Sequence, residues 1–278
     1  MRLDRPIGIY LVLWPTLWSL WLAAEGSPNL ATLVIFVLGV VLMRSAGCVI
    51  NDFADRKVDS QVERTRTRPL VTKVISPKEA IILFISLSVI AFVLVLQTNT
   101  LTIYLSFGAV ALAFCYPFVK RHSHLPQVVL GAAFAWSVPM AFAAQKGELI
   151  QEVALIYVCV LLWTVAYDTF YGMVDREDDM KAGVKSTAIL FGDKDLLVIG
   201  CLQVMVIFCL VLIGERFTLS WPFQLSILVA SSLFIYQQWL AKARTRKAYF
   251  NAFLNNNWVG LVIFVGIAGH YFVEHYLL

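Results

Sequence analysis

The chain has 278 residues, of which 60% are hydrophobic and only 14% are charged, and its mean hydropathy is +0.77. This composition excludes a predominantly soluble protein and predicts a polytopic, all-α membrane protein, with residues 1–278 forming one transmembrane domain. The apolar composition predicts the lipid bilayer as the surrounding medium. The formal net charge of +4 is modest, so we expect no nucleic-acid partner. The five cysteines are scattered, mostly within apolar segments, and we expect them to be buried small side chains.

Nine segments are apolar over the roughly 20 residues that a membrane-spanning helix needs. They lie at about 7–24, 30–50, 80–97, 101–118, 126–144, 151–170, 196–213, 221–241 and 256–275. Pro15 and Pro139 lie inside two of these segments, where the missing N–H of a proline leaves a helix carbonyl without its usual partner. The sequence therefore predicts nine transmembrane helices.

The basic residues predict the orientation of these helices. All but three of the 22 Lys and Arg lie in the N-terminal tail or in the loops after the second, fourth, sixth and eighth helices, the exceptions being Arg44, Lys146 and Arg216. Cytoplasmic loops carry the Lys and Arg excess. We therefore expect the N-terminus and the two long loops in the cytoplasm and the C-terminus in the periplasm. The N-terminus resembles neither a cleaved signal nor a transit peptide, which favours the bacterial inner membrane.

The most informative stretch begins at the end of the second predicted helix, with Asn51, Asp52, Asp55 and Asp59. Asn51, Asp55 and Asp59 are spaced by four residues, so on a helix they would share one face. Carboxylates this close repel one another unless a positive charge lies between them. Oxygen ligands of this kind suit Mg²⁺, which binds through one or two carboxylates together with waters and substrate phosphates. This stretch therefore predicts a magnesium site.

Arginines follow the carboxylates at Arg64, Arg66 and Arg68. An arginine offers two parallel donors that match phosphate oxygens. The alternative interpretation is that these residues only reflect the positive charge of a cytoplasmic loop. Taken with the carboxylates, they indicate a site for Mg²⁺ and a diphosphate.

The end of the sixth predicted helix carries a second acidic stretch. Asp168, Tyr171, Asp175 and Asp179 are spaced by three, four and four residues, so they too would share a face, and Asp178 lies beside it. The second stretch alone is equally typical of a solvated helix end, and the first is less so because its four-residue spacing is regular. Because both are predicted on the same side of the membrane, we expect them to face each other across one cavity and to bind one diphosphate through Mg²⁺.

A diphosphate site within a membrane implies an amphiphilic substrate with an apolar tail. If that substrate is an allylic prenyl diphosphate, breaking its C–O bond gives diphosphate and a delocalised carbocation. Apolar helices would shield this cation from water, and aromatic faces would stabilise it. The candidate aromatic residues are Phe114, Tyr116, Trp163, Phe170 and Tyr171, although most aromatic residues in such a chain belong to the core.

These motifs resemble those of the UbiA superfamily of intramembrane aromatic prenyltransferases, and within it the branch that acts on 4-hydroxybenzoate. The first signature, NDxxDxxxD, falls on Asn51 to Asp59 and is followed by ERTRTRPL, and the second, DxxYxxxDxxDD, falls on Asp168 to Asp179 and is followed by GVKSTAILFG. More specific to the hydroxybenzoate branch are this second signature with its tail, the opening at Arg5, and the runs LWPTLW (13–18), YPFVKR (116–121) and PQVVLG (126–131).

The resemblance implies nine helices around a central cavity, Mg²⁺ on both acidic signatures and a lateral opening for a long tail. It also implies an enzyme of ubiquinone biosynthesis that transfers a polyprenyl group from polyprenyl diphosphate to 4-hydroxybenzoate, at the ring carbon ortho to the hydroxyl. Its two substrates would be its partners. The oligomeric state and the chain length of the prenyl group stay open.

On this basis each candidate residue receives a role. The expected Mg²⁺ ligands are Asn51, Asp55, Asp59, Asp168, Asp175 and Asp179, and of these Asp55, Asp59, Asp175 and Asp179 are the expected catalytic residues. Asp52 and Asp178 are expected either to join them or to pair with basic residues. Asp175 is also our candidate for accepting a hydrogen bond from the phenol hydroxyl; His122 and His124 are weaker candidates for taking the ring proton.

The expected substrate-binding residues are mostly cations. Arg64, Arg68 and Lys185 are expected to bind the diphosphate, and Tyr171 to line the cavity. Arg121 is expected to bind the carboxylate of 4-hydroxybenzoate, the alternative being an interface anchor. Arg44 lies inside a predicted span, where a charge is costly and usually functional, so we expect it either to pair with an acidic side chain or to contact substrate, the alternative being a buried charge without a functional role. Arg5 is a further candidate for a residue that faces the cavity. Asn255–Asn257 are expected either to face the cavity or to cap a helix at the membrane interface.

Three rival functions remain. A transporter or channel would have its charges near the middle of the bilayer and broken helices there, whereas these acids gather at one edge. A phosphotransferase acting on cytidine-diphosphate alcohols would interleave glycine and arginine with its aspartates, and Asn51–Asp59 lacks that pattern. The third rival is another function within the superfamily, prenyl transfer to a menaquinone-type or haem-type acceptor.

Overall fold

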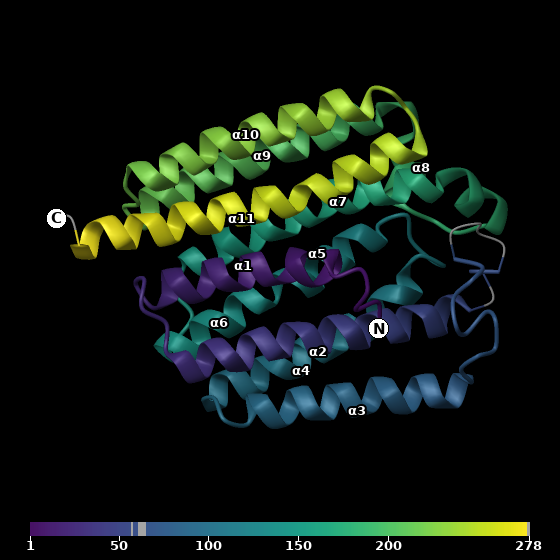
Figure 1. The fold of residues 1–278 in the computed structure, drawn as a ribbon, viewed down its shortest axis with the longest axis horizontal. Helices are drawn as coiled ribbons and strands as arrows, with labels where there is room; N and C mark the ends of the chain where they lie inside the picture. Colours follow the sequence, from purple (N-terminus) through teal and green to yellow (C-terminus); the bar gives the residue numbers. More distant parts are fainter. Residues whose placement is uncertain (57, 61–64, 277–278) are drawn as a thin grey trace.

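The computed structural model describes residues 1–56, 58–60 and 65–276, and within these residues it is helical with no strand. The chain crosses the length of the molecule repeatedly as long helices that lie side by side (Figure 1). In order, the helices are α1 (Ile7–Ala23), α2 (Leu30–Asp55), α3 (Pro77–Val95), α4 (Thr100–Val119), α5 (Pro126–Ala135), α6 (Ser137–Lys146), α7 (Glu152–Ala182), α8 (Thr187–Phe191), η1 (Gly192–Lys194), α9 (Asp195–Arg216), α10 (Trp221–Ala241) and α11 (Arg246–Tyr276).

All nine predicted helices are present in the described part of the chain. The fifth is divided into α5 and α6 at Trp136. The cause is Pro139, which has no N–H to donate to the carbonyl four residues earlier, at Ala135. Seven helical segments of the described residues are long and apolar enough to cross a membrane, with α5 and α6 counted as one, while α1 is apolar but has only 17 residues. The prediction of a polytopic all-α membrane protein is confirmed.

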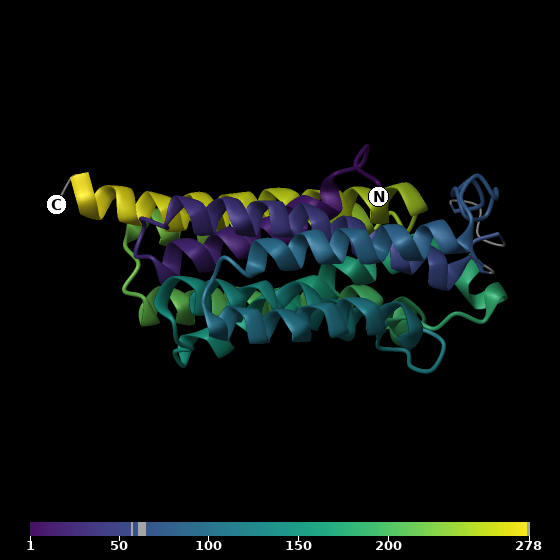
Figure 2. The same cartoon turned by 90° about the horizontal axis from the view of Figure 1, so that it is seen from below.

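The helices that enclose the main core come from both ends of the chain. α1, α5, α6, α7, α9, α10 and α11 share one large cluster of buried apolar residues. Within it the rings of Trp18 and Trp163 stack with centroids 5.3 Å apart. α3 and α4, in contrast, bury few residues and lie at one edge of the molecule (Figures 1 and 2).

Three helices are longer than the sequence predicts, and each extension carries polar residues. α2 continues to Asp55, α7 to Ala182 and α11 starts at Arg246 rather than near residue 256. As a result, the asparagines at 255–257 lie inside α11. Asn256 is 1% exposed and accepts a hydrogen bond from Trp163 Nε1 at 2.9 Å. The alternative that these asparagines are interfacial caps is therefore wrong, because they lie inside the helix and not at its end. Asn256 instead supplies the acceptor that the buried indole N–H of Trp163 needs.

Candidate active site

A cavity of about 710 Å³, which we call the acidic cavity, lies between the C-terminal end of α2 and the C-terminal half of α7. From the first acidic stretch, it is lined by Asn51, Asp52, Asp55 and Asp59. From the second, it is lined by Asp168, Tyr171, Asp175 and Asp179. The two stretches, more than 100 residues apart in the chain, therefore face the same space.

The first stretch reaches the cavity by a helix and a turn. Asn51 and Asp55 lie one turn apart on α2, which ends at Asp55. The backbone then turns so that Asp59 N–H donates to the carbonyl of Asp55 at 2.8 Å. The prediction that one helix carries Asn51, Asp55 and Asp59 is therefore wrong for Asp59, which lies in the turn after α2. The turn nevertheless keeps Asp59 buried, at 5% exposed, and on the cavity wall.

The second stretch lies entirely within α7. Because residues three and four apart share a helix face, Asp168, Tyr171, Asp175 and Asp179 all reach the cavity. Asp178 lies off that face and pairs with Arg246, with nitrogen and oxygen 3.1 Å apart. Asp178 thus follows the second of its two predicted options, pairing with a basic residue.

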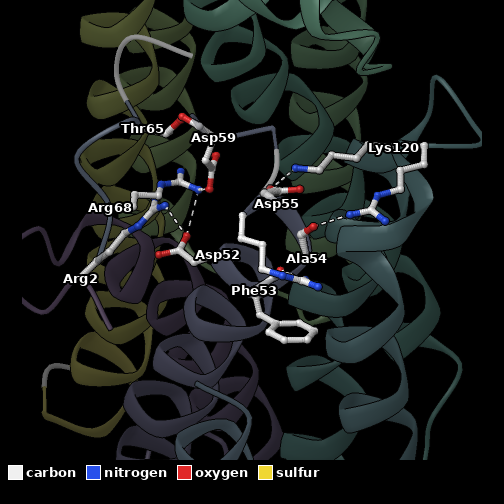
Figure 3. A network of polar contacts seen from close by, with 11 residues as sticks. Arg2, Asp52, Phe53, Ala54, Asp55, Asp59, Thr65, Arg68 and Lys120 are labelled. Atoms are coloured by element: carbon white, nitrogen blue, oxygen red, sulfur yellow. Dashed lines mark hydrogen bonds and ion pairs between the residues drawn. The ribbon is translucent and has the colours of Figure 1, made fainter. Parts of the chain in front are cut away.

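Arg68 joins the acids of the first stretch (Figure 3). Its Nη1 lies 2.6 Å from Asp59 Oδ2 and 3.0 Å from Asp52 Oδ1, and Arg2 adds a contact of 2.9 Å to Asp52. Burial raises the pKa of Asp59, Arg68 opposes this shift, and the neighbouring charges of Asp55 and Asp52 add to it. Arg64, the other predicted arginine of this pair, lies outside the described residues.

Asp55 is the most buried carboxylate on the cavity wall, at 3% exposed. Its Oδ2 accepts a hydrogen bond from Lys120 Nζ, at the end of α4 (Figure 3). Its Oδ1 is buried and has no hydrogen-bond partner among the described residues. Lys120 was missed from the sequence, although it precedes Arg121 in the YPFVKR run, because nothing in that run says which of two adjacent cations turns inward.

Arg121 and Lys185 have different surroundings. Arg121 Nη2 donates to the carbonyl of Ala54, and its guanidinium lies over the ring of Phe118, 5.9 Å from the ring centroid. Arg121 is exposed and is not among the described residues that line the cavity. Lys185 does line the cavity, and its Nζ donates to the carbonyl of His122 at 3.2 Å.

Arg44 lies deeper, two turns before Asn51 on α2, and lines the cavity. Its guanidinium donates to the carbonyl of Gly8 at 3.3 Å and to Cys48 Sγ at 2.9 Å. It makes no ion pair with a carboxylate in the described part of the chain, and its contact with substrate stays a prediction. An intramembrane cation of this kind needs an anion or a polar ligand nearby.

The aromatic candidates divide into two groups. Tyr116 and Tyr171 line the cavity, and Tyr171 packs on Phe253 with ring centroids 4.8 Å apart. Trp163 and Phe170 are fully buried in the main core, and Phe114 is 46% exposed. Of the five candidates, the two tyrosines therefore line the cavity, and Phe250 and Phe253, which were not predicted, line it as well.

The donor set fits a magnesium ion that a substrate helps to bind. Among the described residues, no three His, Cys, Asp or Glu side chains come close enough together to hold a metal ion by themselves. Mg²⁺, however, usually keeps several waters and takes one or two carboxylates together with phosphate oxygens. The unpartnered Oδ1 of Asp55 is a buried anionic oxygen that such an ion would satisfy. The carboxylates of α7 face it across the same cavity.

Sequence comparison gives high similarity to bacterial enzymes over nearly the full length. The chain is 66% identical to a 4-hydroxybenzoate octaprenyltransferase of Saccharophagus degradans, over 96% of this chain and 89% of that protein. It is 59% identical to a protein of the same name from Ectopseudomonas mendocina, over 98% of this chain and 92% of that protein.

Structural comparison agrees. The fold matches the apo structure of a UbiA homolog from Aeropyrum pernix with a TM-score of 0.83 and 26% identity, covering 96% of this chain and 98% of that one. It matches a UbiA homolog from Archaeoglobus fulgidus bound to GPP and Mg²⁺ with a TM-score of 0.75 and 20% identity, covering 97% of this chain and 98% of that one. A model of the UbiA prenyltransferase family matches residues 12–261, and the chain therefore belongs to the UbiA prenyltransferase family.

Proposed function

We propose that this protein transfers a polyprenyl group from polyprenyl diphosphate to 4-hydroxybenzoate, at the ring carbon ortho to the hydroxyl, as a step of ubiquinone biosynthesis. The observation that carries the proposal is that carboxylates of α2 and α7 line one cavity together with Arg44, Arg68, Lys120 and Lys185. Anionic and cationic groups in one cavity suit a metal ion and a diphosphate. The octaprenyl chain in the names of its relatives is our first choice of donor.

In this reaction the bond between the allylic carbon and the diphosphate oxygen breaks, and its electron pair leaves with the diphosphate. The ring carbon of 4-hydroxybenzoate then uses a π-electron pair to form the new C–C bond, and loses its proton. Mg²⁺, which the Archaeoglobus homolog binds together with GPP, would when bound neutralise the negative charge that develops on the leaving group. Asn51, Asp55, Asp59, Asp168, Asp175 and Asp179 are the residues we propose to hold it.

The protein's own side chains supply the rest. Arg68, Lys185 and Arg64, the last of which lies outside the described residues, are proposed to donate to diphosphate oxygens. Lys120 lines the cavity together with Arg68 and Lys185. The rings of Tyr171 and Tyr116 lie on the same wall, where they can stabilise the allylic cation. Asp175, which is 8% exposed, is proposed to accept a hydrogen bond from the phenol hydroxyl as the ring attacks.

Two arginines compete for the carboxylate of 4-hydroxybenzoate. Arg121 is the candidate that the sequence suggests. Arg44 has the stronger structural support, because it lines the cavity and carries no paired carboxylate among the described residues. A benzoate beside Arg44 would have its ring between the acidic residues and the apolar interior.

The protein is proposed to be a multi-pass protein of the bacterial inner membrane, acting as one domain over residues 1–278. The distribution of Lys and Arg supports an orientation with the N-terminus and both acidic stretches on the cytoplasmic side and the C-terminus in the periplasm. In agreement with this arrangement, the C-terminus lies at the end of the molecule away from the C-terminal ends of α2 and α7 (Figure 1).

The test is prenyl transfer by the purified protein in lipid nanodiscs. Wild type is incubated with 4-hydroxybenzoate, a polyprenyl diphosphate and Mg²⁺, and product is measured by mass spectrometry. We expect the prenylated acid from wild type and none with EDTA or with Asp55→Ala. Prenylation of a naphthoate acceptor without any prenylation of 4-hydroxybenzoate would overturn the assignment.

A further inference from the structure

Gln127, in the first turn of α5, is an amide side chain on the wall of the acidic cavity and stands outside the set of residues proposed for the reaction. Only 6% of the residue is exposed. A buried amide needs partners for both its oxygen and its nitrogen, because leaving either of them unsatisfied costs free energy. The partners of Gln127 therefore indicate what the residue does.

The oxygen of this amide has a partner within the protein. Gln127 Oε1 accepts a hydrogen bond of 3.0 Å from the backbone N–H of Thr187, at the start of α8. A backbone N–H can only donate, so the atom that faces it must be the amide oxygen. The amide nitrogen is then on the other branch of the side chain, and the orientation of the group is determined by Thr187.

The segment that carries Thr187 is itself attached at several points. Thr187 is 0% exposed, and its hydroxyl lies 2.8 Å from the hydroxyl of Thr169 on α7. The Thr169 hydroxyl uses its one proton on the carbonyl of Val165, so the Thr187 hydroxyl is the donor of this pair. Two residues before Thr187, the N–H of Lys185 donates to the carbonyl of Lys120 at 3.0 Å. Both α7 and the end of α4 therefore hold the group that orients Gln127.

The nitrogen of the amide faces the cavity. Gln127 Nε2 makes no hydrogen bond to any of the described residues, and it is not fully enclosed by them. It lies 3.4 Å from the position that a Cβ on Gly172 would occupy, and Gly172 lines the same cavity. The N–H groups of Gln127 are therefore presented beside the face of α7 that carries Asp168 and Asp175.

This position is also close to the proposed partner of the acceptor hydroxyl, Asp175. Asp175 lies about one turn beyond Gly172, and helix side chains lean toward the N-terminus of their helix, so its carboxylate extends over the turn that contains Gly172. An oxygen that binds both residues would donate a proton to the Asp175 carboxylate and accept one from Gln127. A hydroxyl can do both, whereas an ionised diphosphate oxygen can only accept.

We propose that Gln127 Nε2 donates to the hydroxyl oxygen of the acceptor and thereby selects a phenol. The inference rests on the proposed function for the identity of the acceptor and for its hydrogen bond to Asp175. The two bonds together fix the position of the ring carbon that reacts. An aromatic amine can donate to Asp175 but accepts poorly from Gln127, because its nitrogen lone pair is delocalised into the ring. A site built to bond a substrate group discriminates against an analogue that cannot form the bond.

The experiment compares 4-hydroxybenzoate with 4-aminobenzoate as acceptors at saturating octaprenyl diphosphate, in wild type and in two variants. Gln127→Glu keeps an oxygen for the N–H of Thr187 and replaces the donor by an acceptor, which suits the second N–H of the amino group. Gln127→Met has a similar size and is neutral, but it removes both groups. The measured quantity is the ratio of kcat/KM for the hydroxyl acceptor to kcat/KM for the amino acceptor.

We expect Gln127→Met to lower this ratio about fivefold, the effect of one hydrogen bond between neutral groups. Gln127→Glu should lower it at least about tenfold, because the variant also gains a bond to the amino group. Gln151→Glu, on an exposed position that does not line the acidic cavity, is the matched control and should keep the wild-type ratio. Because both acceptors are compared on the same protein, partial unfolding of a variant cancels in the ratio.

A ratio that is unchanged in both Gln127 variants would overturn the inference, since a purely structural role affects both acceptors equally. A higher KM for octaprenyl diphosphate with unchanged acceptor constants would assign Gln127 to the diphosphate and would overturn it as well. If wild type prenylates neither acceptor, the proposed function fails instead. The two failures are therefore distinguishable.

A binding measurement tests the same contact without turnover. Dissociation constants of 4-hydroxybenzoate and 4-aminobenzoate are measured by isothermal titration calorimetry, with an unreactive thiolodiphosphate analogue of the donor already bound. We expect wild type to bind 4-hydroxybenzoate more tightly than 4-aminobenzoate, and this preference to shrink in Gln127→Met and to shrink further in Gln127→Glu. Equal changes for the two ligands in both variants would contradict the inference.

Discussion

Lys120 Nζ donates to Asp55 Oδ2, which places the ammonium group of α4 on the most buried carboxylate of the acidic cavity. A divalent cation that binds Asp55 would have to share this carboxylate with the lysine or displace it. Two cations that compete for one anion weaken each other's binding. The same ammonium group, once displaced, would lie beside the diphosphate, where it would be a donor.

The first prediction follows from this competition. Lys120→Met should tighten Mn²⁺ binding in the absence of substrate by about tenfold, because it removes a unit charge next to the ion. It should also raise the KM for prenyl diphosphate, because it removes a phosphate donor. Mn²⁺ binding is measured by electron paramagnetic resonance of the free ion. Lys78→Met, on an exposed position at the start of α3, is the control and should match wild type. Weaker Mn²⁺ binding in Lys120→Met would contradict the competition.

The second prediction concerns the carboxylates that face each other across the cavity. Asp55→Asn and Asp175→Asn should each lower kcat at least about a hundredfold, because each removes a negative oxygen aimed at the developing charges. Mn²⁺ binding should weaken in both variants, since both residues are proposed ligands. If Asp175→Asn kept full turnover with normal Mn²⁺ affinity, Asp175 would have no part in accepting the hydrogen bond of the phenol.

The third prediction separates the two arginines. Arg44→Gln should raise the KM for 4-hydroxybenzoate by about tenfold or more, the effect of losing a hydrogen bond to a charged group, with little change in the KM for prenyl diphosphate. Arg121→Gln should have a smaller effect on the acceptor, because Arg121 donates to the carbonyl of Ala54. Steady-state kinetics with p-cresol, which lacks the carboxylate, provide the control. The reverse order of effects would return the carboxylate to Arg121.

The fourth prediction concerns a buried carboxylate outside the cavity. Asp195, at 0% exposed, pairs with Arg176 of α7 and with Arg244 in the α10–α11 loop. Removing one partner of a buried ion pair costs about 3–5 kcal/mol, so Asp195→Asn should lower the free energy of unfolding by an amount of that order. Denaturation in a detergent series measures this loss. Asp193→Asn, whose side chain is exposed, should unfold like wild type.

The sequence by itself determined the helices and the chemistry of the acidic stretches. Runs of about 20 apolar residues can satisfy their backbone hydrogen bonds in lipid only as helices, so the nine predicted segments hold even where their ends shift. The spacing of Asp168, Tyr171, Asp175 and Asp179 likewise sufficed to put them on one face, because α7 is regular throughout that stretch.

Only the tertiary structure decided which residues meet. Local spacing carried no information on the turn that follows Asp55, on the inward Lys120 and outward Arg121, or on the burial of Asn256 within α11. Each of these depends on what a neighbouring helix, distant in the chain, places opposite it.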